Sequence, residues 1–253
     1  MDSIVASTIQ IELKSESYVY KPYPKHLHGL CYFLAGKDYP HVKYRPPEFH
    51  PFIRQWNSSK LDGTQAIIQI QCIGEPLTYA MLHTLETTRE LWLGHGSLKI
   101  THYSLNKQEV LTLNHLQATP VPTEFKLVFL TPTRFRTFQV DRYQTKAYPD
   151  LRLLIRSMAR SLHILYNVKI SLNEQEELIR SISIINVIGY PVDVKIDRYS
   201  KYDDSFVGEI HLSCHQLSDE QRRLFGMLLK VAKYSGVGHK KGYGFGHIEL
   251  KRA

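Results

Sequence analysis

The sequence predicts an α+β fold with two tandem ferredoxin-like units, each with the element order βαββαβ, and a glycine-rich loop near the C-terminus. Three observations predict this fold. Segments that alternate between apolar and polar residues are interspersed with amphipathic helical segments in both halves of the chain. The order of these segments is the same in each half and matches the split βαβ unit. Five glycines then fall within residues 236–246.

The first half contains one complete set of elements. Residues 3–13 alternate between two faces, which predicts a strand. Apolar residues at helical spacing, followed by Gly36 as a stop, predict a helix over Lys25–Ala35. The other elements expected here are strands Phe49–Trp56 and Gln65–Cys72, a helix over Pro76–Leu93, and strands Ser97–Tyr103 and Glu109–Leu113.

The second half repeats the order of elements without a visible repeat of sequence. Leu151–Tyr166 places its apolar residues on one helical face. Ser218 and Gln221 form a capping box that opens another helix, which Gly236 closes. Asn173–Gly189 is ambiguous between helix and strand. The expected strands are Glu124–Leu130, Pro191–Tyr199, Phe206–Leu212 and Gly244–Lys251.

These elements divide the chain into two domains. Residues 1–114 form the first domain and residues 123–253 the second. Residues 115–122, which include two prolines, are the expected linker.

Composition narrows the function. No stretch approaches the ~20 apolar residues of a membrane span, so no membrane partner is expected. The N-terminal residues alternate and do not show a signal-peptide pattern. Three widely spaced cysteines indicate a reducing compartment, which places the chain in the cytoplasm. A net charge of +8 favours a polyanionic partner, although many basic proteins have none.

The glycine-rich loop is the strongest single motif. Lys240 and Lys241 lie among its glycines, and exposed N–H groups beside lysines form an anion cradle. A helical segment precedes the loop and a strand follows it, which is the reverse of a nucleotide-binding loop. The loop is therefore expected to bind the phosphates of a polymer and not those of a mononucleotide.

The loop sequence GVGHKKGYGFG resembles the glycine-rich loop of the repeat-associated RNA-binding superfamily of CRISPR systems. Three more segments resemble the branch that processes CRISPR repeats. They are LVFLTPTRFR at residues 127–136, FVGEIHLSC at residues 206–214, and the first helix with its histidine-containing loop and Pro-Phe strand at residues 26–56. The chain is thus similar to the CRISPR-associated repeat-processing endoribonucleases, whose two domains are RRM-like.

The resemblance implies cleavage of the repeat in precursor CRISPR RNA without metal or other cofactor. The ribose 2′-hydroxyl would attack the adjacent phosphate, leaving a 2′,3′-cyclic phosphate and a 5′-hydroxyl. The expected partners are precursor CRISPR RNA, the mature guide RNA that the protein retains, and other CRISPR effector subunits.

Two alternatives remain open. A non-catalytic RNA-binding subunit of a CRISPR effector complex would share the loop and the basic charge but would need no positioned histidine. A general RNA-binding protein would usually carry exposed aromatic residues on its central strands. The predicted central strand QAIIQIQC has none, which argues against that class.

The resemblance places the catalytic histidine between the first helix and the Pro-Phe strand. His41 lies in this loop and is favoured as general base or acid, since a histidine pKa lies near neutrality. His50 immediately precedes Pro51 and is the second choice. His28 or His26 can instead face the scissile phosphate from the helix, and any histidine can be merely exposed or structural.

Neighbouring residues supply the other expected roles. Lys43 or Arg45 would neutralise charge on the phosphate. Tyr39 or Tyr44 would orient the 2′-hydroxyl. It is equally consistent with the sequence that the two basic residues are solvated loop charges and that the two tyrosines are half-buried rings.

Basic residues elsewhere are candidates for RNA contact. Arg134 and Arg136 alternate on one segment and are expected to point the same way. Arg198 and Lys201 lie near a predicted hairpin and would grip an RNA stem. In the glycine-rich loop the expected contacts are Gly236, Gly238, His239, Lys240, Lys241, Gly242 and Gly244.

Other patterns carry less weight. Arg152, Arg156 and Arg160 form a helical row that can bind RNA or a subunit, or simply face solvent. Tyr243 and Phe245 can stack on bases, but alternation along the last strand makes at least one of them core. No metal site is expected, because the cluster around Cys214 has no second ligand group at zinc spacing.

Overall fold

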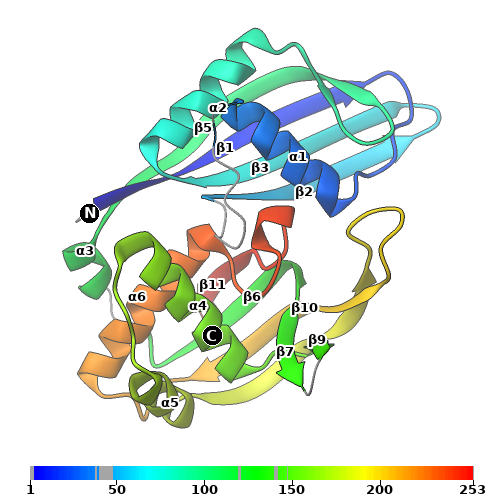
Figure 1. Ribbon diagram of the computed structural model, residues 1–253. Coiled ribbons are helices and arrows are strands. Elements are labelled where there is room, and N and C mark those ends of the chain that lie inside the picture. The colour runs from blue at the N-terminus through cyan, green and yellow to red at the C-terminus, as the bar shows by residue number, and fades with distance from the viewer. Residues whose placement is uncertain are drawn as a thin grey trace.

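The computed structural model describes residues 3–37, 39, 48–118, 121–139, 142–146 and 148–252. Two antiparallel sheets lie one above the other, each with helices on one face (Figure 1). The predicted α+β class and the two tandem ferredoxin-like units are confirmed.

The first unit contains most of the N-terminal half. Its sheet has the strand order β2-β3-β1-β5-β4, and α1 and α2 cover one face. The elements are β1 (Ser3–Ser15), α1 (Pro24–Ala35), β2 (Phe49–Ser59), β3 (Gly63–Ile73), α2 (Glu75–Thr87), β4 (Glu90–Trp92) and β5 (Ser97–Thr112). The short helix α3 (Leu113–Gln117) leads to the second unit.

The second unit has a sheet of order β11-β6-β10-β9. Read from β9, its strands β9-β10-β6-β11 correspond to β2-β3-β1-β5 of the first sheet, in which β4 is an additional edge strand. The elements are β6 (Glu124–Thr133), β7 (Phe135–Gln139), β8 (Arg142–Lys146), α4 (Leu151–Tyr166), α5 (Leu172–Ser181), β9 (Ser183–Val194), β10 (Asp203–Ser213), α6 (Asp219–Ser235), the 3-10 turn η1 (Lys241–Tyr243) and β11 (Ile248–Arg252). Strands β7 and β8 pair only with each other.

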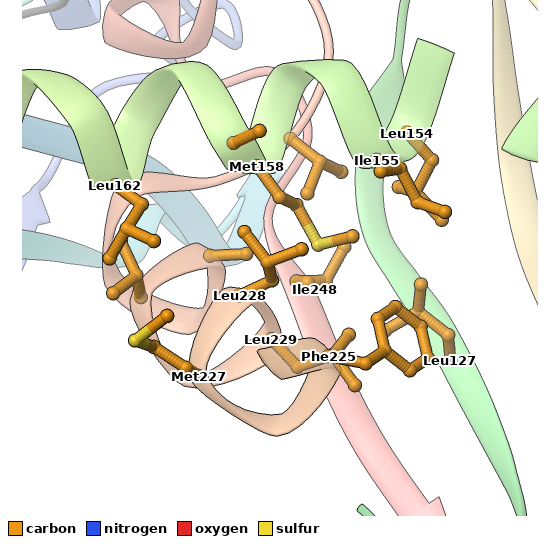
Figure 2. Close-up of a cluster of buried hydrophobic side chains, with 14 of the residues drawn as sticks. Leu127, Leu154, Ile155, Met158, Leu162, Phe225, Met227, Leu228, Leu229 and Ile248 are labelled. Carbon is orange, nitrogen blue, oxygen red and sulfur yellow. The ribbon is translucent and has the colours of Figure 1, made fainter. Parts of the chain in front are cut away.

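The amphipathic helices bury their apolar faces against the sheets. In the second unit, Met158 and Leu162 of α4 meet Leu228 of α6 above Leu127 and Ile248 of the sheet (Figure 2). Burial of each such side chain contributes roughly 1.5–3 kcal/mol. The periodicity predicted for residues 151–166 and 218–235 is therefore the periodicity of this core.

Several predicted elements differ from the structure. The helix expected over Pro76–Leu93 ends at Thr87, because Thr88 turns extended and Leu91 and Leu93 join the core from β4 and the following turn. The strands expected at 97–103 and 109–113 form one strand, β5, whose pairing with β1 skips Asn106. The ambiguous segment 173–189 contains both α5 and most of β9.

The predicted last strand is also shorter than expected. Residues 244–247 lie outside β11, which begins at Ile248. Gly244 and Gly246 have φ of +89° and +77°, values that do not occur in a regular strand. The glycine-rich segment is consequently a loop that ends beside β6, and it lies between the two units (Figure 1).

Candidate functional site

A hydrogen bond joins the two ends of the glycine-rich loop between α6 and β11. The Val237 N–H donates to the Gly246 carbonyl oxygen over 2.9 Å. A Cβ added at Gly246 would lie 1.8 Å from the Val237 oxygen, so no other residue fits there. The glycines thus permit a close approach of two backbone segments.

Most of the loop's N–H groups already have partners within the protein. Gly246 donates to the Pro132 oxygen, His239 to the Arg134 oxygen, and Gly238 to Ser157 Oγ at 2.8 Å. Val237, Tyr243 and Gly244 also donate to backbone carbonyls. The expected cradle of exposed N–H groups is therefore not formed at these positions, and the loop's positive charge comes from its side chains.

His28 of α1 contacts the loop directly. Its Nδ1 lies 3.0 Å from the Gly242 carbonyl oxygen, and its ring stacks on Tyr243 with 4.1 Å between centroids. Because a carbonyl oxygen only accepts, Nδ1 carries a proton in this contact. In the neutral ring the basic nitrogen is then Nε2.

His50 lies deeper at the same junction and differs from the catalytic residue expected. It is 1% exposed, and its Nε2 donates to the Phe245 carbonyl oxygen over 3.0 Å. Burial, followed by the charge of Lys241, lowers the His50 pKa to about 4. In this structure the buried His50 imidazole joins β2 to the loop.

His247 completes the junction and was not identified from the sequence. Its ring stacks on Phe52 of β2 at 3.9 Å, and its centroid lies 5.4 Å from that of His50. Burial lowers the pKa of His247 to about 2, with His50 the next cause. No local sequence feature distinguishes His247 from the other histidines. Its role depends on which strand packs against the loop, and the sequence does not show this.

The two loop lysines lie in different environments. Lys240 is partly exposed, and its Nζ lies 5.0 Å from the centre of the Tyr243 ring. Lys241 points inward and donates to Ser161 Oγ of α4 over 2.5 Å. Burial, followed by the charge of Arg160, lowers the Lys241 pKa to about 7. Lys240 is therefore placed for an external anion and Lys241 for internal anchoring.

Arg134 and Arg136 lie in different environments, one buried and one exposed. Arg134 lies between β6 and β7, is 4% exposed, and pairs with Asp203 at 2.5 Å beside the Phe245 ring. Arg136 is exposed and contacts His239 Nε2 at 3.0 Å. The strand ends at Thr133 and restarts at Phe135, which breaks the alternation that the prediction used.

His239 is surrounded by positively charged side chains, among them Arg136, Arg134 and Lys240. Burial, followed by the charges of Arg136 and Arg134, lowers its pKa to about 4. Phe245 is buried, so the expectation that at least one loop aromatic belongs to the core is confirmed.

The loop between β9 and β10 reaches the first unit. Lys25 of α1 pairs with Asp197 at 3.5 Å, and its N–H donates to the Ile196 oxygen. Arg198 lies over the ring of Tyr199, and Lys201 is exposed nearby. A hairpin is present as expected, but β9 ends at Val194, so the strand expected over Pro191–Tyr199 is wrong beyond that residue and its last part forms the loop. This loop lies beside the same helix that carries His28 (Figure 1).

The remaining predicted residues are accounted for as follows. Arg152 and Arg156 pair with Glu176 of α5, which satisfies this part of the basic row within the second unit. Tyr39 packs its ring near Tyr32 and Phe49. His41, Lys43, Tyr44 and Arg45 lie outside the described residues.

Within the described ranges, no cluster of three or more His, Cys, Asp or Glu residues is arranged to hold a metal ion. Among the same residues, no helix is both long and apolar enough to cross a membrane.

Comparison with known proteins agrees with this architecture. The model of the family described as CRISPR-associated endoribonuclease Cas6 matches residues 127–248. A product complex of Thermus thermophilus Cas6 (TTHB231) is 22% identical, with a TM-score of 0.80 over 97% of this chain and 100% of that chain. A product complex of Cas6 (TTHA0078) is 22% identical, with a TM-score of 0.76 over 98% and 99%.

A more distant structure, from a Cas6-related gene of Pyrococcus furiosus, is 15% identical, with a TM-score of 0.60 over 97% of this chain and 98% of that chain. No curated protein sequence matches the chain. The solved structures establish the fold over nearly the full length, and the family match in the second half confirms the resemblance seen in the sequence.

Proposed function

We propose that this chain, which resembles the CRISPR-associated endoribonuclease family Cas6, is itself an endoribonuclease that cuts repeat sequences in precursor CRISPR RNA. We further propose domains at residues 1–114 and 123–253, joined by residues 115–122. The observation that carries the proposal is the junction of the two units, where His28 contacts a lysine-bearing glycine-rich loop.

The proposed reaction needs no nucleophile from the protein. The 2′-oxygen of the RNA forms a bond to the adjacent phosphorus while the bond from phosphorus to the 5′-oxygen breaks. One group removes the 2′-hydroxyl proton and another supplies a proton to the 5′-oxygen. Positioned acid–base groups are typically worth ~10²–10⁴-fold in rate. The products are a 2′,3′-cyclic phosphate and a 5′-hydroxyl.

The proposed roles follow from position and chemistry. His41 is assigned as base or acid by the family resemblance. His28 is assigned as a second imidazole at the junction, because it is only partly buried and contacts the loop. Lys240 is partly exposed beside Tyr243, the ring on which His28 stacks, and its positive charge would neutralise the phosphate in the transition state. Arg136 adds exposed positive charge beside His239 of the same loop. Arg198 and Lys201 would hold a neighbouring part of the RNA.

The buried and half-buried groups at the junction have a different proposed task. His50, His247 and Lys241 fix the loop against β2 and α4. Arg134 holds the base of the β9–β10 hairpin through Asp203. These contacts would keep the loop in one geometry before RNA binds, and preorganisation of this kind lowers the cost of binding.

The test is cleavage of a labelled cognate repeat RNA in excess chelator, beside the same RNA with a single 2′-deoxy nucleotide at the scissile position. We expect cleavage of the first RNA only, with a cyclic phosphate end. Retention of the product would appear as a slow release of the labelled guide. Cleavage that depends on added divalent metal would contradict the proposed mechanism.

A non-catalytic RNA-binding subunit is the alternative. It predicts tight binding of both RNAs and no cleavage of either. That outcome would replace the endoribonuclease assignment, and co-purification with other effector subunits would then be the next measurement.

A further inference from the structure

We propose that the chain carries a second RNA subsite, a stacking platform for unpaired bases, where the β1–α1 segment, the β4–β5 turn and the β9–β10 hairpin meet. The proposal rests on the proposed function in that its ligand is the same RNA. It concerns bases outside the segment held by the glycine-rich loop.

A row of aromatic rings lies on this surface. Tyr18 and Tyr20 are edge to face at 4.8 Å, and Tyr20 lies 6.2 Å from His95. His95 lies another 6.2 Å from His26, the residue two positions before His28. Tyr20 is 62% exposed, so this ring contributes little to the core of the free protein.

The backbone holds the tyrosines outward. Val19 between them is buried, and its N–H donates to Thr64 Oγ1 over 2.8 Å. Because side chains on either side of an inward residue of an extended segment point away from it, Tyr18 and Tyr20 face solvent. The tight turn at Gly94 packs against His26, since a Cβ at this glycine would lie 2.6 Å from His26 Nδ1.

The hairpin adds a further exposed ring with a cation beside it. Asp197 Oδ1 accepts from the N–H groups of Tyr199 and Ser200, and Asp197 Oδ2 pairs with Lys25. These contacts fix the turn against the start of α1. Tyr199 is 85% exposed, and the Arg198 guanidinium lies 5.4 Å from its ring.

Charge and chemistry favour nucleic-acid bases as the occupant. Aromatic faces beside cations are the common means of binding single-stranded nucleic acid, because every base has a face for stacking. Lys21, Arg198 and Lys201 are exposed here, while the Asp197 carboxylate is engaged by Lys25 and the turn. A partner protein would need a larger apolar area than isolated tyrosines provide.

The platform is continuous with the junction. Lys25 and His28 are three residues apart and therefore lie on one face of α1. Lys25 binds the hairpin, and His28 contacts the glycine-rich loop. An RNA strand that leaves the loop along this face reaches the exposed rings within about one helical turn.

The test compares binding of two catalytically blocked RNAs, both with a 2′-deoxy scissile nucleotide. One is the repeat alone, and the other carries ten unpaired nucleotides, added at either end in separate samples. We expect the extension at one end to tighten binding to the natural protein. Tyr20→Ala with Tyr199→Ala should remove that gain, about 5- to 150-fold per stacked base, and leave the affinity for the repeat alone unchanged.

Three controls make the result specific. Tyr20→Phe with Tyr199→Phe keeps the rings and should retain the gain. Tyr79→Ala removes an exposed tyrosine of α2 outside the platform and should change nothing. Abasic nucleotides in the extension should abolish the gain, because phosphates alone do not stack.

The platform is overturned if neither extension tightens binding, or if the double alanine variant weakens both RNAs equally. Its failure is distinguishable from failure of the proposed function. Loss of cleavage in chelator, with the extension effect intact, would remove the enzymatic assignment and leave the platform standing.

Discussion

Single imidazoles decide the chemistry proposed for this molecule, because the chain has thirteen histidines in very different environments. His41→Ala should lower the cleavage rate by ~10²–10⁴-fold, the usual worth of a positioned acid or base. His28→Ala is expected to fall in the same range if its imidazole takes part in proton transfer. Single-turnover cleavage of the labelled repeat, at saturating protein, measures both.

The matched control is His83→Ala on α2, an exposed histidine beside Glu86 and away from the loop. It should cleave at the natural rate. If His41→Ala and His28→Ala both cleave as fast as this control, the assignment of the acid and base is wrong. If His28→Ala changes only RNA affinity, this histidine is a positioning residue.

The environment of His50 predicts how the stability of the protein depends on pH. Its pKa of about 4 in the folded protein lies below the ordinary histidine value, so the unfolded chain binds more protons between pH 6.5 and 4. The free energy of unfolding should therefore fall on acidification through this window, by on the order of 2–3 kcal/mol from this group alone. Chemical denaturation at a series of pH values measures it.

His50→Gln keeps a donor for the Phe245 carbonyl oxygen and removes the titration. Its pH profile should be flatter than that of the natural protein between pH 6.5 and 4. His83→Gln, the same change at an exposed histidine of α2, is the control. Equal slopes for all three proteins would show that His50 is not held neutral at the junction.

At the scale of elements, the glycine-rich loop depends on backbone that only glycine adopts. Gly246→Ala should destabilise the protein by about 2 kcal/mol or more, because φ is +77° and the Cβ would meet the Val237 oxygen at 1.8 Å. Gly29→Ala in α1 is the comparison variant, because its Cβ would meet nothing within 4 Å. Alanine there should raise the free energy of unfolding by ~0.5–1 kcal/mol. Urea unfolding of both variants tests the contrast, and destabilisation of the same size in both would contradict it.

The elements also show where sequence patterns carry information. The helix over residues 151–166 was predictable because its apolar stripe faces one continuous core. The β9 strand was not, because it is an edge strand whose residues Ile184, Val187 and Ile188 stay partly exposed. With neither face buried, no alternation develops. Ile188→Ser should thus change the free energy of unfolding by less than about 0.5 kcal/mol, whereas Leu212→Ala in β10 should cost ~2–5 kcal/mol.

Much of the site escaped prediction for a related reason. The glycines, lysines and first helix were visible because they lie in short segments of distinctive composition. The contacts of His50 with Phe245 and of His247 with Phe52 join residues about 195 positions apart. Nothing local marks such pairs, since they are fixed by how the two sheets stack.

At the scale of the whole molecule, the two units are also joined by a polar contact at the C-terminal end of α6, which leads into the loop. Glu109 of β5 accepts from the Tyr234 hydroxyl at 2.6 Å and pairs with Lys230 at 3.1 Å, both on α6. Burial alone would raise the Glu109 pKa, but bonds from Tyr234 and Lys230 lower it to about 2. The carboxylate is therefore more stable in the folded protein than in the unfolded chain.

This contact and the glycine-rich loop together fix how the first unit lies on the second. Glu109→Gln removes the charge and should cost about 1–3 kcal/mol, because Lys230 is left largely buried beside an uncharged amide. The loss should be coupled to Tyr234: the double variant Glu109→Gln, Tyr234→Phe should be more stable than the sum of the single effects predicts. A double-mutant cycle in urea at pH 7 measures the coupling.

The lowered pKa of Glu109 also predicts how the cost of Glu109→Gln changes with pH. A depressed acid contributes stability above its unfolded pKa of 4.5 and loses it as the pH falls towards 2, so Glu109→Gln should matter less at pH 3 than at pH 7. The exposed Glu90 of β4 is the control, and Glu90→Gln should be neutral at both values. If Glu109→Gln costs the same at both pH values, the contribution of this contact to stability does not depend on the charge of Glu109.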